Sequence, residues 1–579
     1  MSRRDDLVAR ARAWRDDDPD DTTRAELDEL LARLKTESTS ETTSQPATTS
    51  ETESVPEDGE AYAELTDRFA GLLAFGTAGL RGALGAGPNR MNRAVVIRAA
   101  AGLTTYLQRD REIAAPRVVI GFDARLNSET FAVDTAEVVA GAGGTAMVLS
   151  RPLPTPVLAF AVRHLGADAG VMVTASHNPA NDNGYKVYLG DGSQIVPPAD
   201  EDIAARIEEV DRVGDVARSG QGWTRLGEEV LEAYLQGVVA VVEPDSSREL
   251  SLVHTALHGV GAEVVRRAFT GAGFAAPAPV EEQEHPDPAF STVTFPNPEE
   301  AGAMDAALSL ADATRPDAVI ANDPDADRCA VAVPGPGGWR MLRGDEVGAL
   351  LGHHMIRRGI DPDGDRTVLA RSIVSSRLLG AMAAAAGLPA AETLTGFKWI
   401  GRVPGLVFGY EEALGYCVDP ARVPDKDGVS AALLIAELLA GLRAQGRTVD
   451  DLLDELARAH GVYATDAFSV RVSDVSMVTP ILARLVDSPP RRIGDVEVRS
   501  VEDLEHPDDD LPATPGVRFF LHDDTRVIVR PSGTEPKLKI YVEVIVDVPS
   551  EHELTTSRAE ARRRLDEVLA TMDELTRVG

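Results

Sequence analysis

The stretch 117–176, RVVIGFDARLNSETFAVDTAEVVAGAGGTAMVLSRPLPTPVLAFAVRHLGADAGVMVTAS, decides the fold. Short runs rich in Val and Ile alternate in it with longer segments whose apolar residues recur at helical spacing. We expect strands at 117–123, 144–150 and 169–176, and helices at 128–142 and 155–165. Because strands that alternate with helices form sheets covered by helices on both faces, this stretch indicates an α/β domain.

The same alternation returns twice further along the chain, with breaks near Gln221 and Gly337. Past about Val462 the character changes to closely spaced strands followed by a long charged helix at 550–576, which is typical of an α+β domain. A chain of 579 residues is long enough for about four domains. We therefore expect three similar α/β domains at 61–220, 221–336 and 337–461, and an α+β domain at 462–579.

The first 60 residues differ in composition from the rest. Residues 1–34 read as one amphipathic helix of mixed charge, and the segment 35–60 is acidic, rich in Ser and Thr, and almost free of apolar side chains. Such a segment cannot bury enough apolar surface to offset the entropy lost on ordering, so we expect a disordered insert or linker there.

The overall composition excludes several classes of protein. The net charge is −35, which disfavours a nucleic-acid partner, because binding to phosphates needs a basic face. No apolar run approaches the ~18 residues of a membrane span, and the acidic N-terminal stretch is not a signal peptide. Two cysteines, Cys329 and Cys417, are too few for a disulfide framework, so we expect reduced thiols in a cytoplasmic protein.

A serine and a histidine follow the last strand of the opening stretch, where Ser176 and His177 precede the turn pair Asn178-Pro179. Lys186 lies a short loop further on. No G-x-S-x-G elbow surrounds Ser176, which argues against acyl transfer. A hydroxyl is a weak nucleophile that needs a base and nearby positive charge, and phosphoryl transfer with Lys186 or His177 as base fits that need. An inert loop serine is the alternative.

Three aspartates alternate in the stretch ANDPDADRCAV, which follows an apolar run. In an extended loop the side chains of Asp323, Asp325 and Asp327 would point the same way and repel one another unless a cation lies among them. Oxygen ligands suit Mg²⁺. The turn glycine and distal glutamate of an EF-hand are replaced by Arg328 and Pro334, which excludes that motif. A solvated acidic turn is the alternative.

Two further loops carry donors suited to a phosphate group. RPSGTEPK places Arg530, a Ser-Gly-Thr turn and Lys537 between two strands, and an ordinary hairpin loop is the alternative. FGTAGLRG places Arg81 among glycines. The chain contains neither G-x-x-x-x-G-K-[ST] nor G-x-G-x-x-G, so nucleotide binding has no support.

A fourth set of polar residues lies in the third block. TGFKWIG contains Lys398, and GYEEALGY contains Glu411 and Glu412. A lysine and paired acids beside loop glycines could bind sugar hydroxyls and phosphate.

Together these stretches resemble one family, the α-D-phosphohexomutases. The resemblance rests on four motifs in the family's order, which span 75–544: T-A-S-H-N-P at 174–179, D-x-D-x-D-R at 323–328, YEEALG at 410–415 and R-P-S-G-T-E-P at 530–536. FGTAGLRG, NRMN, GFKW and DKDGVSA are similar to the branch that contains phosphopentomutases, glucose-1,6-bisphosphate synthases and many bacterial phosphomannomutases.

The resemblance implies four domains around a central cleft and a mutase that moves a phosphoryl group between C1 and C6 of a hexose. Ser176 would carry the phosphoryl group and pass it to a sugar monophosphate, and a bound sugar bisphosphate would turn over before Ser176 takes back the other group. A sugar 1,6-bisphosphate would serve as activator. Lys186 and His177 would assist proton transfer, while Arg81 and Arg328 would neutralise charge.

The resemblance also implies ligands for a metal and for the substrate. Mg²⁺ would be bound by the three aspartates and an oxygen of phosphorylated Ser176. Glu411, Glu412 and Lys398 would bind the sugar, and the loop formed by Arg530, Ser532, Gly533 and Thr534 would bind the phosphate that does not react. We expect a monomer or homodimer that acts on a small phosphosugar, without nucleic acid or membrane partners.

Two departures bear on the sugar. Many relatives have a serine where this chain has Ala413, and the other bacterial branch has a histidine where this chain has Lys398. A pentose-phosphate mutase and a glucose-1,6-bisphosphate synthase are therefore alternatives. A Mg²⁺-dependent phosphatase would release inorganic phosphate, and a non-catalytic sugar-phosphate sensor would be expected to have lost the serine or an aspartate.

Overall fold

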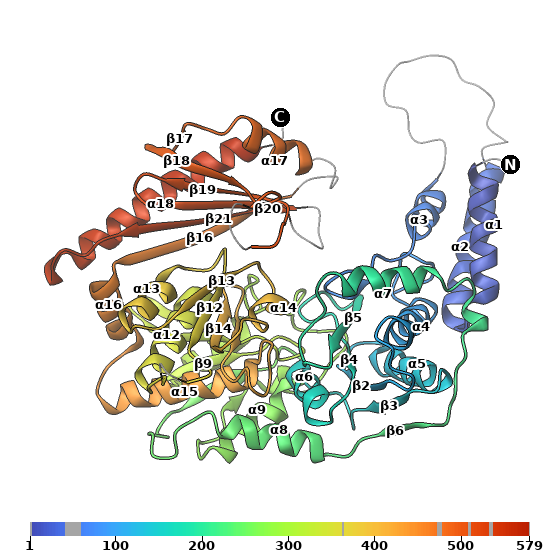
Figure 1. Cartoon of the computed structure of the whole chain (residues 1–579), viewed down its shortest axis with the longest axis horizontal. Helices are drawn as coiled ribbons and strands as arrows, with labels where there is room; N and C mark the ends of the chain where they lie inside the picture. Colours follow the sequence, from blue (N-terminus) through green and yellow to red (C-terminus); the bar gives the residue numbers. More distant parts are fainter. Residues whose placement is uncertain are drawn as a thin grey trace. The chain divides into compact units, whose positions relative to one another are not determined.

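The computed structural model describes residues 3–40, 59–361, 364–471, 478–507, 511–531 and 537–577. The chain forms two compact units. Unit 1 consists of Met1–Ala240, Ser251–Cys329 and Ala421–Val429, and unit 2 consists of Val241–Leu250, Ala330–Pro420 and Ser430–Gly579. Each unit is coloured by sequence in Figure 1.

The first sheet of unit 1 has the strand order β1-β5-β4-β2-β3-β6. β2, β3, β4 and β6 are parallel, and β5 and β1 run antiparallel at one end. The strands are β1 (Leu80–Ala83), β2 (Arg117–Phe122), β3 (Thr145–Val148), β4 (Ala169–Val173), β5 (Asp182–Leu189) and β6 (Trp223–Arg225). The helices are α4 (Arg93–Arg109), α5 (Ser128–Gly141), α6 (Thr155–His164) and α7 (Ala199–Glu208).

Alternation along β2 explains why helices cover both faces of this sheet. Val118, Ile120 and Phe122 are buried in one core with side chains of α4, α5 and α7. Gly121 faces the other way, where α6 packs against it. Successive side chains of a strand point to opposite faces, so an apolar strand is buried only when both faces are covered.

A second α/β layer completes unit 1. Its strands β7 (Leu252–Thr255), β8 (Ala278–Pro279) and β9 (Ala318–Ala321) are parallel, with β7 between the other two. The helices of this part are α8 (Glu229–Val239), α9 (Gly261–Gly271), α10 (Glu281–Glu284) and α11 (Asp305–Thr314), and a 3-10 turn, η2 (Val213–Asp215), precedes them.

Unit 2 begins with a hairpin and continues with a third α/β layer. The hairpin pairs β10 (Ala330–Gly335) with β11 (Gly338–Met341). The sheet order is β13-β12-β14-β15, formed by β12 (Val368–Ser372), β13 (Ala390–Thr393), β14 (Leu406–Glu411) and β15 (Gly415–Cys417). The helices are α12 (Gly344–Arg357), α13 (Leu378–Ala385), α14 (Phe397–Ile400), α15 (Gly428–Ala444), whose first two residues belong to unit 1, and α16 (Val449–His460).

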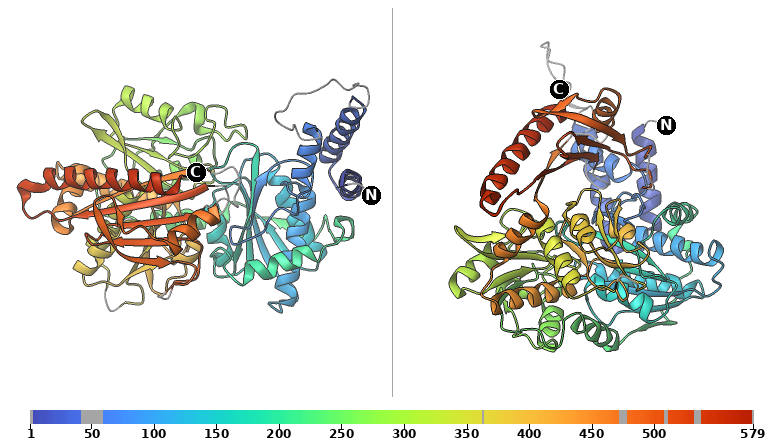
Figure 2. Two further views of the ribbon diagram at one scale, coloured as in Figure 1. Left: turned by 90° about the horizontal axis from the view of Figure 1, so that it is seen from above. Right: turned by 60° about the vertical axis from the view of Figure 1, so that its left-hand side comes forward.

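The C-terminal part of unit 2 is an antiparallel sheet with a long helix packed on it, as Figure 2 shows. Its order is β16-β21-β20-β19-β18-β17. The strands are β16 (Val462–Arg471), β17 (Arg492–Ile493), β18 (Val496–Asp503), β19 (Val517–Leu521), β20 (Arg526–Pro531) and β21 (Lys537–Val546), and the helices are α17 (Val478–Asp487), η4 (Glu551–Glu553) and α18 (Leu554–Thr576). Three α/β layers followed by an α+β domain confirm the expected fold class.

The N-terminal segment differs from the expected single helix. Two helices are present, α1 (Arg3–Asp17) and α2 (Asp21–Ser40), and Pro19 between them cannot continue a helix. The side chain of Asp18 accepts hydrogen bonds from the Asp20 amide and the Thr23 hydroxyl, which stabilises the turn. With α3 (Glu60–Arg68) these helices share a small apolar core.

The start of the expected disordered segment was also wrong, because residues 35–40 belong to α2. Glu37 accepts a hydrogen bond from the Ala61 amide, so the end of α2 is joined to the beginning of α3. The rest of the segment, 41–58, lies outside the described residues.

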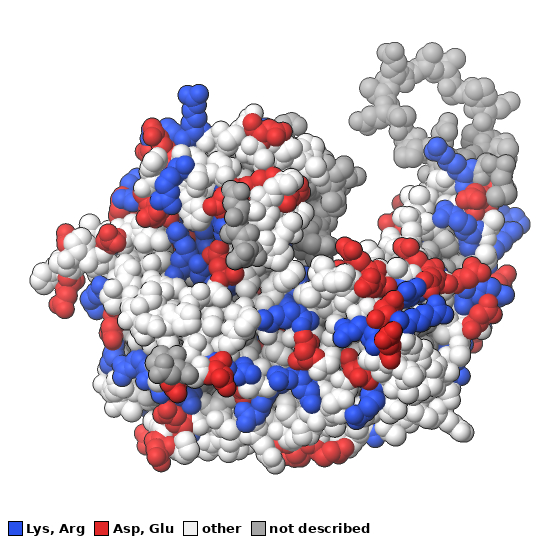
Figure 3. All heavy atoms as spheres, viewed as in Figure 1, with Lys and Arg blue, Asp and Glu red and all other residues white. Residues whose placement is uncertain are grey.

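On the face drawn in Figure 3, acidic and basic side chains lie interspersed over the surface. Among the described residues, no single helix is long and apolar enough to cross a lipid bilayer. α15 and α16 together have that length and composition, but they bend by 93° at the break between them, and α15 is lined with buried side chains.

Candidate active site

Ser176 lies in a tight loop directly after the buried strand β4. Its backbone has a φ of 51°, in the left-handed region that few residues other than glycine adopt. Its Oγ donates a hydrogen bond of 2.7 Å to Asp323 Oδ2 and lies 3.2 Å from His177 Nδ1. The side chain is 3% exposed. Strained backbone of this kind persists only where its surroundings hold it.

Arg125 supplies much of that support, and the sequence analysis did not single it out. Its guanidinium donates hydrogen bonds to the carbonyl oxygens of Ser176 and Asn178, both at 2.6 Å, and to those of Pro179 and Asp182. The same group pairs with Asp123 and stacks over the ring of Phe290. Bonds to backbone carbonyls leave no pattern in the sequence of the loop, and the only signal was an arginine two residues after the acid that ends a buried strand.

The three aspartates Asp323, Asp325 and Asp327 are brought together as predicted. They follow β9, are at most 1% exposed, and each offers a carboxylate oxygen within 4.8 Å of those of the other two. Gly259 packs so closely on this loop that a Cβ there would lie 2.2 Å from Pro324 Cα. Asp325 Oδ1 and Asp327 Oδ1 are buried without a hydrogen-bond partner among the described residues. Buried oxygens with spare acceptor capacity fit a hard divalent cation such as Mg²⁺.

Burial and mutual repulsion set the charges of this cluster. Burial, together with the charges of Asp325 and Asp327, raises the pKa of Asp323 to about 8. Burial would also raise the pKa of Asp327, but the ammonium groups of Lys186 and Lys426 outweigh it, so the pKa falls below its usual range. Protons or cations must therefore compensate the excess negative charge.

Lys186 comes from β5, opposite Met172 of β4. Its Nζ donates to Asp325 Oδ2 at 2.7 Å and to Asp327 Oδ2 at 2.9 Å. Burial alone would lower the pKa of Lys186, but these two carboxylates raise it. The lysine is therefore held in its charged form beside the aspartates.

Lys426 is a second lysine at this site, and the sequence analysis assigned it no role although it quoted the motif DKDGVSA. Its Nζ lies 3.3 Å from Asp327 Oδ2. Asp425 accepts hydrogen bonds from Tyr188 and Gln194, and Asp427 accepts one from Tyr234. These bonds fasten the loop 421–429 to the rest of unit 1.

Arg81, His177 and Arg328 also lie in unit 1. Gly79, with a φ of 74°, lets β1 approach β5 so closely that a Cβ would lie 1.9 Å from the Tyr185 carbonyl oxygen, and β1 then carries Arg81 to the side chain of Asn178 at 3.1 Å. Burial, reinforced by Arg328 and Arg81, holds the pKa of His177 well below its usual range, so its imidazole is neutral.

The predicted sugar residues lie in unit 2. Glu411 ends β14 and accepts a hydrogen bond of 2.6 Å from the amide of Gly396, the residue that precedes α14 and Lys398. Glu412 accepts bonds from the hydroxyls of Ser372 and Ser375. Burial, then the neighbouring carboxylates of Glu411 and Asp345, raise the pKa of Glu412 to about 7.

Arg530, at the end of β20, pairs across the ladder with Lys539 of β21. Tyr541 of β21 interacts electrostatically with both Arg530 and Glu412, so the strands that flank the expected phosphate loop lie near the sugar residues. Ser532, Gly533 and Thr534 lie outside the described residues.

Comparison with protein families decides the assignment. Models of the phosphoglucomutase/phosphomannomutase family match in order: α/β/α domain I at 72–213, domain II at 232–337, domain III at 343–460 and the C-terminal domain at 485–561. The chain belongs to this family. It is accordingly an enzyme, an intramolecular phosphotransferase of the mutase type.

Individual relatives of the phosphoglucomutase/phosphomannomutase family resemble nearly the whole chain. A "Probable phosphomannomutase" of Haemophilus influenzae is 45% identical over 84% of this chain and 96% of its own length. The human phosphopentomutase is 34% identical over 88% and 90%, respectively. A crystal structure of a Thermus thermophilus protein assigned as a phosphomannomutase is 26% identical, with a TM-score of 0.66, and covers 86% of this chain and 99% of its own.

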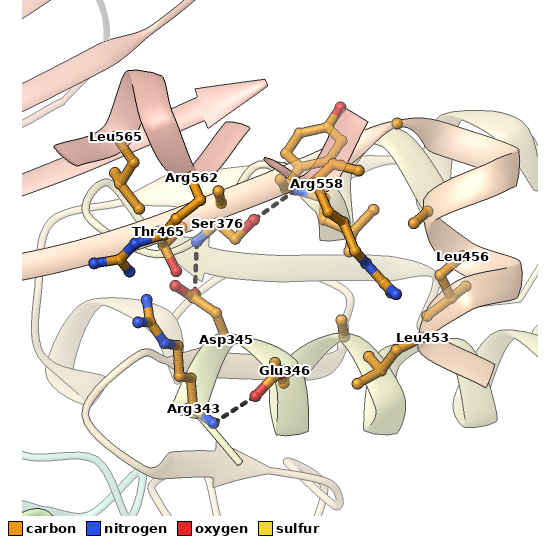
Figure 4. A pocket seen from close by; sticks show the side chains of 17 residues that line it. Arg343, Asp345, Glu346, Ser376, Leu453, Leu456, Thr465, Arg558, Arg562 and Leu565 are labelled. Carbon is orange, nitrogen blue, oxygen red and sulfur yellow. Dashed lines mark hydrogen bonds between the residues drawn. The ribbon is translucent and has the colours of Figure 1, made fainter. Parts of the chain in front are cut away.

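Unit 2 of this family member also contains a cavity of about 290 Å³, drawn in Figure 4. Its wall includes Arg343, Asp345, Ser376, Arg558 and Arg562, but neither the sugar loop nor Arg530. The three arginines already pair with carboxylates of Asp466, Asp454 and Asp566. An anion would have to displace these partners, so we assign no ligand to this cavity.

Proposed function

We propose that this enzyme is a phosphohexomutase that moves a phosphoryl group between C1 and C6 through a phosphorylated Ser176 and a hexose 1,6-bisphosphate. The observation that carries the proposal is the contact of Ser176 Oγ with Asp323 inside a buried cluster of three aspartates and two lysines. Phosphoryl transfer depends on positioning and charge neutralisation more than on covalent chemistry, and this cluster supplies both.

In the first transfer the bond between Ser176 Oγ and phosphorus breaks, and a bond forms between phosphorus and a sugar hydroxyl oxygen, which gives up its proton. In the second transfer the other phosphoryl group returns to Ser176 Oγ, and its former sugar oxygen gains a proton. Lys186, held charged by Asp325 and Asp327, donates that proton and accepts it in the opposite direction. His177 stays neutral and can accept the hydrogen bond of the Ser176 hydroxyl.

The three aspartates would hold Mg²⁺ together with an oxygen of phosphorylated Ser176. When bound, the ion supplies positive charge next to the oxygens of the transferring group. Arg81 and Arg328 contribute further fixed positive charge in unit 1.

We assign sugar recognition to Glu411, Glu412 and Lys398, and recognition of the phosphate that does not react to Arg530, Ser532, Gly533 and Thr534. These groups would use acceptors for hydroxyls and a guanidinium for phosphate. The domain limits given above (61–220, 221–336, 337–461 and 462–579) assign one task to each domain: serine, metal, sugar and phosphate. A sugar 1,6-bisphosphate would prime Ser176 of an enzyme that acts in the cytoplasm as a monomer or homodimer.

A pentose-phosphate mutase is the second candidate, because the chain is 34% identical to the human phosphopentomutase. A panel of glucose, mannose, ribose and deoxyribose 1-phosphates, assayed with and without glucose 1,6-bisphosphate, tests both. Preference for the hexoses by kcat/KM supports the first, and preference for the pentoses supports the second. Release of inorganic phosphate without isomerisation would instead indicate a phosphatase.

Ala413 is expected to keep sugar selectivity low. A site that hydrogen-bonds a substrate hydroxyl discriminates strongly against analogues that lack it, whereas an apolar contact discriminates weakly. Ala413→Ser should therefore sharpen the preference among the four 1-phosphates, measured as kcat/KM, and leave phosphorylation of Ser176 unchanged. If the wild-type enzyme already prefers one sugar by more than about a thousandfold and the serine changes nothing, Ala413 does not set selectivity.

Glu412 should make sugar binding depend on pH near neutrality. Its pKa of about 7 means that the carboxylate, the better acceptor for sugar hydroxyls, is protonated as the pH falls from 8 to 6. We expect KM for glucose 1-phosphate to rise about tenfold over that range, as the ionised fraction falls about tenfold at one unit below the pKa. In Glu412→Gln only the ionisation of the substrate phosphate should remain, so an identical pH profile in that variant would contradict this role.

A further inference from the structure

Residues 372–377, here called the connector, lead from the end of β12 into α13. Ser375 in the connector has two different partners. Its hydroxyl donates to Glu412 Oε2 at 3.1 Å and accepts from the Glu412 amide at 3.0 Å. Its carbonyl oxygen accepts a hydrogen bond of 2.8 Å from Arg526 Nη2. One residue thus joins the expected sugar loop to a strand of the C-terminal sheet.

Glu543 of β21 binds the next two residues of the connector. Its carboxylate accepts hydrogen bonds from the Ser376 hydroxyl and the Arg377 amide, both at 2.8 Å, and from Arg377 Nε at 2.5 Å. Glu543 also stands opposite Arg526 in the β20–β21 ladder, with 3.5 Å between Arg526 Nη2 and its Oε2. From the other side, the Ser376 amide donates to Asp345, as seen in Figure 4.

Apolar packing follows the same route. Ile373 and Val374 of the connector share a core with Ile528 of β20 and Tyr541 of β21. β20 and β21 are the strands that flank the expected phosphate loop. The connector is therefore held by the phosphate-binding strands on one side and holds Glu412 on the other.

We propose that Arg526 and Glu543 are positioning residues for sugar recognition, which act on Glu412 through Ser375. This inference rests on the proposed function, in which Glu412 binds the sugar. Neither residue needs to touch substrate. Docking of the C-terminal strands on the connector orders the acceptor for sugar hydroxyls, so that the phosphate and sugar ends of the substrate are recognised by one rigid element.

Stability alone is a poor reason for this arrangement. Arg526 and Glu543 are at most 2% exposed, and Arg526 Nη1 has no hydrogen-bond partner among the described residues. Desolvation of a buried ion pair commonly cancels its Coulomb attraction, and apolar replacements of similar volume are often neutral or stabilising. What the pair does supply is fixed geometry, because the Arg526 guanidinium grips two connector carbonyls, those of Val374 and Ser375.

Arg526→Met tests the proposal, and Arg518→Met is the matched control. Arg518, on the adjacent strand β19, is also buried and also joins the C-terminal sheet to the third α/β layer, but its guanidinium binds the carboxylates of Glu392 and Glu502. We expect Arg526→Met to raise KM for glucose 1-phosphate about tenfold, the effect of one weakened charge-assisted hydrogen bond, with kcat within about threefold. Arg518→Met should change both by less than about twofold, even if its melting temperature falls as far.

Two further measurements separate positioning from general loosening. Inhibition by inorganic phosphate, which reports on the phosphate loop, should change less than about threefold in Arg526→Met. Ser375→Ala removes the hydroxyl bonded to Glu412 but keeps the carbonyl, and it should raise KM by a similar factor. Because both changes act through the same contact, the double variant should resemble the single ones. Independent, multiplying effects would overturn the proposal, as would an equal rise of KM in Arg518→Met.

The proposed function can fail separately. If the wild-type enzyme shows no turnover of any 1-phosphosugar, the mutase assignment is wrong. The same comparison then uses the Kd of glucose 1-phosphate from calorimetry, where a tenfold difference between Arg526→Met and Arg518→Met supports the positioning role, and equal or undetectable binding in the wild type and both variants rejects it.

Discussion

Ser176→Ala is expected to lower mutase turnover by at least about four orders of magnitude, because no other group can carry the phosphoryl group between the two transfers. The wild-type protein as purified should contain a fraction with one added phosphate on the peptide that includes Ser176, and the variant should contain none. Intact-mass and peptide analysis, together with kcat for glucose 1-phosphate, measure both. Alanine has no greater difficulty than serine at a φ of 51°, so the variant should fold.

Ser150→Ala is a suitable control for that experiment. Ser150 lies in the same unit, and its hydroxyl donates to Glu228 at the surface. It should keep both turnover and the phosphopeptide. Retention of full activity by Ser176→Ala would refute the covalent mechanism.

Asp325→Asn should lower kcat by about a thousandfold while the protein stays folded. The carboxylate of Asp325 is one of three that would bind Mg²⁺, and it also accepts bonds from Lys186 and the Thr155 hydroxyl. An amide of the same shape keeps the packing but removes a charge where the transition state needs organised electrostatics. Lys186 still has Asp327 as a partner, so its charge is not left unpaired.

The melting temperature gives a readout of this site that does not depend on turnover. A ligand that binds only the folded state stabilises it in proportion to the logarithm of its concentration over Kd. Added Mg²⁺ should therefore raise the melting temperature of the wild type and have much less effect on Asp325→Asn. Without Mg²⁺, the variant should melt no lower than the wild type, because one of three repelling carboxylates is gone. Undiminished activity of the chelated enzyme, or a variant that is inactive only because it unfolds, would contradict this account.

Sequence patterns predicted the fold well wherever burial dictates the pattern. β2, β3 and β4 are apolar on both faces, and each lies within the range expected for it. The cluster of Ser176 with the three aspartates followed from motifs whose residue types are demanded by their chemistry. Both succeeded because a local run of residues carries the whole signal.

The parts that were missed depend on contacts distant in sequence or made by the backbone. Arg125 holds the Ser176 loop through carbonyl groups, which every residue possesses, so the loop sequence cannot reveal it. Lys426 reaches Asp327 from a loop about 100 residues further along the chain, and only the alternation of charge in DKD marked it. The expectation of one helix at the N-terminus was wrong because Pro19 was given too little weight against the charge pattern around it.

The return of residues 421–429 to unit 1 has a consequence during protein synthesis. The ribosome makes Ala330–Pro420 of unit 2 before it reaches this loop. At roughly 5–20 residues per second, the ~100 residues between Cys329 and Val429 take on the order of 5–20 s. During that interval the nascent unit 1 lacks the aspartates that pair with Tyr188 and Tyr234, and the catalytic carboxylates lack Lys426. The enzyme's chemistry is thus completed by a late-arriving piece of chain, and a polypeptide released before that codon would have an unfinished, excessively acidic catalytic centre.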